Sequence, residues 1–215
     1  MNCRDIVLSY VQNCEKNEPI FIEDIQKYVM QFYNEEEKEK IFNNIKEILN
    51  RLNKENVIKM AYKGIYYIPK FNIFGEMPLA NSKIIQRKYL IDSLESVKGY
   101  VTGAALFNKV GLTTQVPNVI DIVTNECKNN NKYTNKYLNV TIRKPKVTVN
   151  TENYKYLQLI DLIENKDNIN IEVDNIDEII YDFIQENNLN FEKILKYVRE
   201  TNSNAVVKKL VMLAR

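Results

Sequence analysis

Histidine is absent from this 215-residue sequence. Because histidine is the commonest general base, metal ligand and triad partner, its absence counts against most hydrolases and zinc enzymes. Glycine is also scarce, with five residues, and none of them forms a Walker or dinucleotide-binding loop that would cradle a phosphate. These absences favour a binding protein over an enzyme, with no cofactor and no bound metal.

Long apolar runs and paired cysteines are missing as well. No run approaches the roughly 18 apolar residues that cross a bilayer, and the first residues contain no signal-peptide core. The cysteines Cys3, Cys14 and Cys127 are an odd number without metal-type spacing, which is typical of reduced, mostly buried thiols. We therefore expect a cytoplasmic protein without a membrane partner.

Charge is distributed unevenly although the net charge is only +2. Residues 82–146 carry 11 basic and 4 acidic side chains, whereas residues 147–215 carry 8 basic and 12 acidic ones. Such asymmetry indicates a face for nucleic acid or for an acidic partner. A basic stretch that is merely solvated is the alternative interpretation.

The first 70 residues combine three helical patterns with a β-hairpin pattern. Apolar residues recur at helical spacing at about residues 4–14, 25–33 and 35–53, with a short apolar strand or turn at 20–22. β-rich runs follow at residues 57–60 and 65–68. Gly64 supplies the positive φ that the tight turn between these runs needs. This order predicts a winged helix-turn-helix, whose third helix enters the major groove while the hairpin follows the DNA backbone.

The rest of the chain predicts a second domain. We expect helices at about residues 82–97 and 104–110, strands at 119–123, 138–142 and 147–149, and further helices near 154–160, 176–183, 194–198 and 206–213. The fold class is α+β: a winged helix-turn-helix over residues 1–70, a linker at 71–81, and a mixed α/β effector domain over 82–215 with a small sheet and a helical C-terminal part. The apolar Phe71, Ile73, Phe74 and Met77 predict that the linker packs.

Candidate DNA contacts lie on the third helix and at the hairpin. Its apolar stripe, from Ile41 to Leu52, is expected to face inward and to leave a polar face outward. Asparagine can pair with adenine, and lysine can donate to guanine or to phosphate. The alternatives are a solvated helix face, an ordinary hairpin edge, and an ion pair for the arginine. The candidates are Lys40, Asn43, Lys46, Asn50, Arg51, Lys59, Tyr62 and Lys63.

Candidate effector contacts lie in a polar loop and in the basic segment of the second domain. The loop follows Gly111, a glycine suited to a left-handed helix cap, so its side chains can simply hydrogen-bond that turn. The functional alternative is one surface that recognises a partner. Its residues would be Thr113, Thr114, Gln115, Lys128, Lys132, Arg143, Lys144 and Lys146.

One set of residues superficially suggests an enzyme. Asp121, Glu126 and Lys128 echo the acids and lysine of metal-dependent nucleases, in which carboxylates hold magnesium. The spacing is short, and Glu126 follows the strand instead of lying on a second one. We therefore rank a divergent nuclease last.

Several motifs resemble a known family. They are the segments 49–58 and 63–69, Phe-Gly-Glu-Met-Pro at 74–78, Gly-Tyr-Val-Thr-Gly at 99–103, Gly-Leu-Thr-Thr-Gln-Val-Pro at 111–117, and Leu-Gln-Leu-Ile-Asp at 157–161. Together they resemble AbiEi-like antitoxins of type IV abortive-infection toxin–antitoxin systems, over about residues 5–165. The two glycine-containing motifs at 99–103 and 111–117 are more specific to this family than the hairpin segment at 63–69, because many winged helices end in a similar hairpin.

The resemblance implies an antitoxin that represses its own operon. Its partners would be double-stranded DNA of its own operator, in repeated sites, and a nucleotidyltransferase toxin that it counteracts without a stable complex. Glu35, Glu36, Glu37 and Glu39 depart from this pattern, because they suit the helix dipole but repel phosphate. A winged helix that contacts only proteins, as an adaptor, is the second hypothesis.

Overall fold

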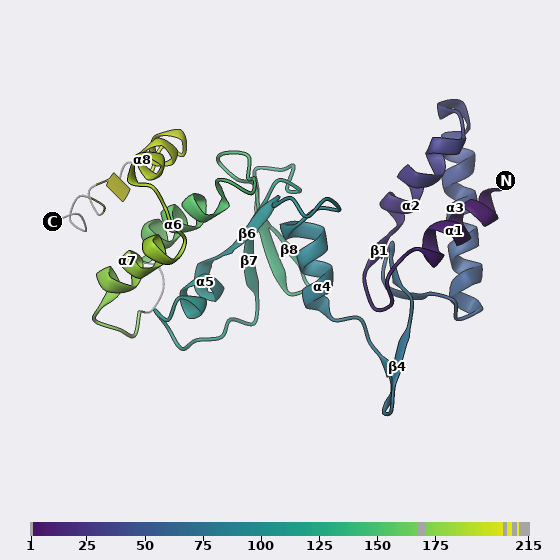
Figure 1. The fold of residues 1–215 in the computed structure, drawn as a ribbon, viewed down its shortest axis with the longest axis horizontal. Coiled ribbons are helices and arrows are strands. Elements are labelled where there is room, and N and C mark those ends of the chain that lie inside the picture. Colours follow the sequence, from purple (N-terminus) through teal and green to yellow (C-terminus); the bar gives the residue numbers. More distant parts are fainter. Residues whose placement is uncertain (1, 167–170, 204–205, 208–209, 211–215) are drawn as a thin grey trace. The chain divides into compact units, whose positions relative to one another are not determined.

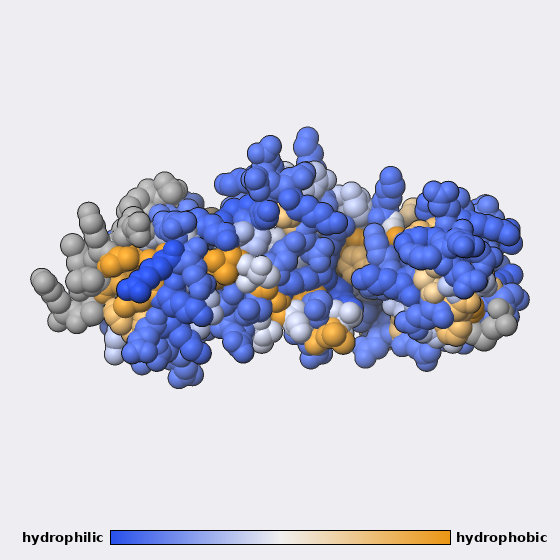
Figure 2. Space-filling model, turned by 90° about the horizontal axis from the view of Figure 1, so that it is seen from above, coloured by the Kyte–Doolittle hydropathy of each residue, from blue (hydrophilic) through white to orange (hydrophobic). Residues whose placement is uncertain are grey.

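The computed structural model describes residues 2–166, 171–203, 206, 207 and 210, and in this part of the chain it has an α+β fold with eight α-helices and three small sheets. The chain divides into two compact units, residues 1–84 and 85–215 (Figure 1). No helix among the described residues is long and apolar enough to cross a membrane. Hydrophilic side chains cover most of the surface drawn in Figure 2.

The first unit packs three helices around one apolar core. These are α1 (Cys3–Gln12), α2 (Ile22–Val29), which ends in a 3₁₀ turn (Met30–Phe32), and α3 (Lys38–Lys54), which a 3₁₀ turn (Glu35–Glu37) precedes. Each helix has apolar side chains three or four residues apart, so each presents one stripe to the core. The most deeply buried members, all at most 1% exposed, are Ile6, Val7, Ile25, Val29, Ile45, Leu49 and Leu52.

A three-stranded antiparallel sheet completes this core. Its strands are β1 (Ile20–Phe21), β2 (Lys59–Tyr62) and β3 (Ile65–Tyr67), in the order β1-β3-β2. Tyr62 pairs with Ile65 across a two-residue turn in which Gly64 has a φ of 77°. The predicted hairpin and its glycine are therefore confirmed.

The segment that we expected to be a packed linker forms a second hairpin instead. Strands β4 (Lys70–Asn72) and β5 (Gly75–Met77) pair antiparallel, and the side chains of Phe71, Ile73 and Phe74 are 67%, 92% and 90% exposed. The Asn72 side chain accepts a hydrogen bond from the Phe74 N–H and closes the turn. Local turn formation at Asn72 and Gly75 thus outweighs burial of the apolar side chains.

The predicted helix over residues 82–97 is shorter than expected. Helix α4 (Asn81–Ile85) continues as a π-helical turn (Gln86–Leu90) and stops there. The carboxylate of Asp92 accepts hydrogen bonds from the N–H groups of Leu94 and Ser96, and Glu95 has a φ of 60°. These local bonds compete with helix formation and turn the chain.

A four-stranded mixed sheet lies at the centre of the second unit. Its strands are β6 (Gly99–Thr102), β7 (Ile120–Thr124), β8 (Tyr133–Asn135) and β9 (Val140–Arg143), in the order β6-β7-β9-β8, and only β7 and β9 pair in parallel. The short helix α5 (Gly103–Lys109) links β6 to the loop before β7. The expected strand at 147–149 is wrong: Val149 bonds the side chain of Asn125 instead of a strand.

Helices form the remainder of the second unit. They are α6 (Tyr154–Asn165), α7 (Ile176–Glu186) and α8 (Phe191–Glu200), and α6 is buried along most of its length. Its apolar side chains pack with those of α5, α7 and α8 in one core. Val206, Val207 and Leu210 are helical, whereas Leu213 of the last predicted helix lies outside the described residues.

Candidate functional site

The outer face of α3 is the first candidate surface. Ile41, Ile45, Ile48, Leu49 and Leu52 are at most 5% exposed, which confirms the predicted inward stripe. The opposite face, which is exposed, carries Lys40, Asn43, Lys46, Glu47 and Asn50. Amide and ammonium groups on one exposed helix face can reach base edges or phosphates.

Ion pairs at the two ends of α3 modify this face. Arg51 lies 3.8 Å from Glu47, with both side chains about two-thirds exposed, so the pair is weak and the guanidinium stays accessible. At the other end, Glu35 pairs with Lys38 at 2.6 Å on the surface. The cations of the face, Lys40, Lys46 and Arg51, are therefore spread along the helix.

The β2–β3 hairpin contributes one exposed cation and one engaged cation. Lys63 is exposed at the turn, and Tyr62 beside it is half-buried. Lys59 instead donates to the carboxylate of Glu76, which also accepts a hydrogen bond from the Tyr67 hydroxyl at 2.8 Å. The Lys59 and Tyr67 hydrogen bonds lower the pKa of Glu76. Lys59 thus ties the second hairpin to the first, whereas Lys63 points to solvent.

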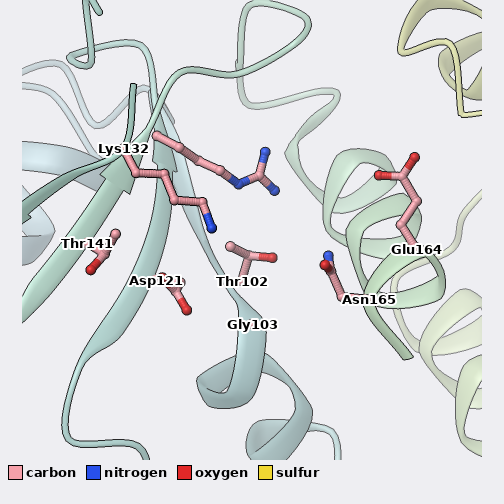
Figure 3. A pocket seen from close by; sticks show the side chains of 8 residues that line it. Thr102, Gly103, Asp121, Lys132, Thr141, Glu164 and Asn165 are labelled. Atoms are coloured by element: carbon pink, nitrogen blue, oxygen red, sulfur yellow. The ribbon is translucent and has the colours of Figure 1, made fainter. Parts of the chain in front are cut away.

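A polar cavity of about 210 Å³ in the second unit is the second candidate site (Figure 3). The sheet register sets Thr102, Asp121 and Thr141 side by side on three neighbouring strands, and their side chains line the cavity. Lys132, from the loop before β8, also lines the cavity. Glu164 and Asn165 close it from the end of α6.

Gly103 brings the Asp121 carboxylate against the start of α5. A Cβ atom at Gly103 would lie 2.7 Å from Asp121 Oδ2, and the residue has a φ of 65°, so both space and backbone favour glycine. The neighbouring Thr102 is 4% exposed, and its hydroxyl has no hydrogen-bond partner among the described residues. Buried polar atoms without a partner are rare in native proteins.

A buried charge network forms the inner wall beside this cavity. Arg143 donates to Asp161 Oδ2 at 2.5 Å, and the Tyr100 hydroxyl donates to the same oxygen at 3.1 Å. Burial and the Asp161 charge raise the pKa of Tyr100 well above its usual range. Burial lowers the pKa of Arg143, but the charge of Asp161 raises it by more, so the pKa of Arg143 lies above its usual value. Tyr100 and Arg143 therefore both donate to the buried side chain of Asp161.

The predicted effector residues do not form one surface. Thr113 is buried, and its hydroxyl accepts from the Gln115 N–H at 3.2 Å. Thr114 donates twice to Glu172 at 2.7 Å. The loop thus forms hydrogen bonds within its own turn and with the segment before α7.

The basic residues of the same prediction lie in several environments. Lys132 and Arg143 line the cavity, while Lys146 bonds Glu164 at 3.2 Å. Lys128 and Lys144 are exposed.

The nuclease-like set is not assembled either. Glu126 pairs with Lys98 at 3.1 Å, and neither Glu126 nor Lys128 lines the cavity that contains Asp121. In the part of the chain that is described, no three His, Cys, Asp or Glu side chains gather to hold a metal.

Sequence reasoning missed the cavity residues Thr102, Thr141, Glu164 and Asn165. Thr102 lies within the quoted Gly-Tyr-Val-Thr-Gly motif, so a signal was present, but its role depends on strand pairing. The other three lie in ordinary strand and helix patterns.

The chain matches the model of a known protein family. The model of a family of unknown function, DUF6088, matches residues 16–190, which is most of the chain. A comparison with curated proteins found no match.

Proposed function

The chain belongs to DUF6088, a family of unknown function, and we propose that residues 1–70 form a winged helix-turn-helix domain that binds double-stranded DNA. The element order supports this proposal: three helices, a short strand after the first, and a terminal hairpin that pairs with that strand. In this arrangement α3 would enter the major groove, and the turn at Lys63 would contact the backbone.

One observation carries the proposal. The apolar stripe of α3 is buried, so Lys40, Asn43, Lys46 and Asn50 are left together on an exposed face. Lysines on such a face neutralise phosphates, and asparagines offer the donor and acceptor that adenine requires. Burial of Asn43 and Asn50 would have removed this surface.

We further propose that the protein is an autorepressor and antitoxin. The motifs that resemble AbiEi-like antitoxins extend from the first unit into the second, through Gly-Tyr-Val-Thr-Gly at 99–103 and the loop at 111–117. The partner would be a nucleotidyltransferase toxin that is counteracted without a stable complex. The proposal assigns no catalytic step to this chain.

DNA binding is tested with a triple variant, Lys40→Ala, Asn43→Ala and Lys63→Ala, in gel shifts with the DNA upstream of its own gene. Loss of two phosphate contacts should weaken binding and should flatten the slope of log K against log salt by about 2. A matched control removes the same residue types from the second unit: Asn118→Ala, Lys193→Ala and Lys196→Ala. Equal binding by both triple variants would exclude this docking.

The antitoxin proposal is tested separately by co-expression. A nucleotidyltransferase encoded next to the gene is induced with the wild-type chain or with the triple variant of α3 and the hairpin. Both should rescue growth, while only the wild type represses a reporter from its own promoter. Failure of the wild type to rescue growth would contradict the antitoxin role and would leave the repressor role standing.

A protein-binding adaptor is the second candidate function. The exposed apolar side chains of Phe71, Ile73 and Phe74 favour it, because exposed aromatic clusters mark protein contacts. Glu35, Glu36, Glu37 and Glu39 at the start of α3 favour it too, since they repel phosphate. Absence of any gel shift at low salt would select this candidate over the repressor.

A further inference from the structure

The size of the cavity beside Asp121 limits what it can hold. Its volume is about 210 Å³, whereas sites for drug-sized ligands span roughly 300–1,000 Å³. An occupant would therefore be compact, smaller than a nucleotide. The cavity lies wholly within the second unit, so it is independent of the DNA-binding surface.

The charges that line the cavity fall into two groups. Arg143 and Glu164 are already engaged, with Asp161 and with Lys146. Asp121 and Lys132 make no ion pair with each other or with any other residue that the structure describes. Figure 3 shows both of these side chains reaching the same hollow. The site thus presents one uncompensated carboxylate and one uncompensated ammonium.

Thr102 is a buried polar residue in the wall of the cavity. Its side chain is more than nine-tenths buried and lines the cavity, and its hydroxyl lacks a partner within the described part of the chain. The hydroxyl oxygen itself has almost no accessible surface, and in Figure 3 it lies on the side of Asn165, away from Asp121 and Lys132. The two unpaired charges alone therefore mark the site.

From these observations we propose that the cavity binds a free α-amino acid. The ligand ammonium lies at Asp121, and its carboxylate lies at Lys132. Two anionic and two cationic side chains line the cavity, so a ligand without net charge keeps the site balanced. A phosphate would leave its negative charge largely uncompensated, because Arg143 is already paired.

The experiment is calorimetry on the full chain with each of the twenty amino acids as the probe. At least one should bind saturably, and its N-acetyl and carboxamide analogues should each bind about tenfold more weakly, because each analogue lacks one charged contact. Ribose 5-phosphate and inorganic phosphate serve as the other probes. Binding of either phosphate in place of every amino acid would overturn the proposed ligand class.

Variants assign each pole of the ligand to its residue. Asp121→Asn should abolish the preference for the free amine over the N-acetyl analogue, and Lys132→Met should abolish the preference for the acid over the carboxamide. Asp177→Asn and Lys128→Met, which are exposed and outside the cavity, are the matched controls.

Folding is checked by circular dichroism for every variant. Lys132 is exposed in a loop, so its variant should fold even if the one at Asp121 does not. No saturable binding of any amino acid to the wild-type chain overturns the proposal. Binding that Asp121→Asn and Lys132→Met leave unchanged, with both variants folded, overturns the assigned site.

Discussion

Replacement of Asp161 by asparagine tests whether the buried network at Arg143 holds the second unit together. The Asp161 side chain is 7% exposed and accepts from both Arg143 and Tyr100, whereas the Arg143 side chain is 25% exposed. Asp161→Asn keeps the size of the side chain but leaves the guanidinium without its counter-charge. The loss should therefore reflect charge and not a cavity.

The expected magnitude follows from the burial of the two groups. Removing one partner of a fully buried ion pair costs about 3–5 kcal/mol. Because a quarter of Arg143 remains accessible to water, which can hydrate the orphaned cation, we expect a loss of about 2–4 kcal/mol in the free energy of unfolding. The double variant Asp161→Leu with Arg143→Met leaves no unpaired charge but removes the acceptor of the Tyr100 hydroxyl, so it should recover only part of this loss.

Urea unfolding followed by far-ultraviolet circular dichroism measures both variants. With a slope of about 2 kcal/mol per molar urea, the midpoint for the second unit should fall by about 1–2 M in Asp161→Asn. Lys146→Met, which removes an exposed pair with Glu164, is the control and should shift it little. A loss below about 1 kcal/mol for Asp161→Asn, or a double variant less stable than the single one, would refute the reasoning.

Three further predictions concern exposure, backbone packing and pH. Phe74→Ser should change the free energy of unfolding by less than about 0.5 kcal/mol because the ring is exposed. Phe107→Ala should cost about 3–5 kcal/mol because Phe107 is fully buried. Similar losses for the two variants in urea unfolding would contradict the exposed hairpin. Gly99→Ala should lower the melting temperature, since its Cβ would lie 2.2 Å from the Tyr89 carbonyl oxygen; an unchanged temperature would contradict this packing. Tyr100 has a raised pKa, so the folded state keeps a proton that the unfolded state loses above about pH 10, and stability should fall as pH rises beyond that value. Tyr100→Phe should reduce this alkaline loss in urea titrations at pH 9 to 11, and an equal loss in both proteins would contradict the assignment.

Periodicity predicted the first unit well because its signals are local. The stripe from Ile41 to Leu52 repeats every three or four residues, and its inward orientation is confirmed by burial. Gly64 likewise occupies the turn position that its type indicates. In both cases the residues that determine the structure lie within one helix or one turn.

The predictions failed where local hydrogen bonds outweigh periodicity. Asp92 ends the helical pattern by bonding two following N–H groups, although apolar residues continue to Val97. Asn72 and Gly75 turn an apolar segment into a hairpin whose side chains stay exposed. Hydrophobic patterning alone treats both segments as buried, because it counts side chains and ignores turn chemistry.

The cavity could not be predicted from the sequence for a different reason, namely that its residues are far apart along the chain. Thr102, Asp121 and Thr141 are about twenty residues apart along the chain, and only the pairing of β6, β7 and β9 sets them side by side. A shift of the β7–β9 register by one residue would turn Thr141 to the other face of the sheet. Lys132 comes from a loop whose course no pattern indicates. A site of this kind depends on long-range register, so its chemistry becomes visible only once the sheet is known.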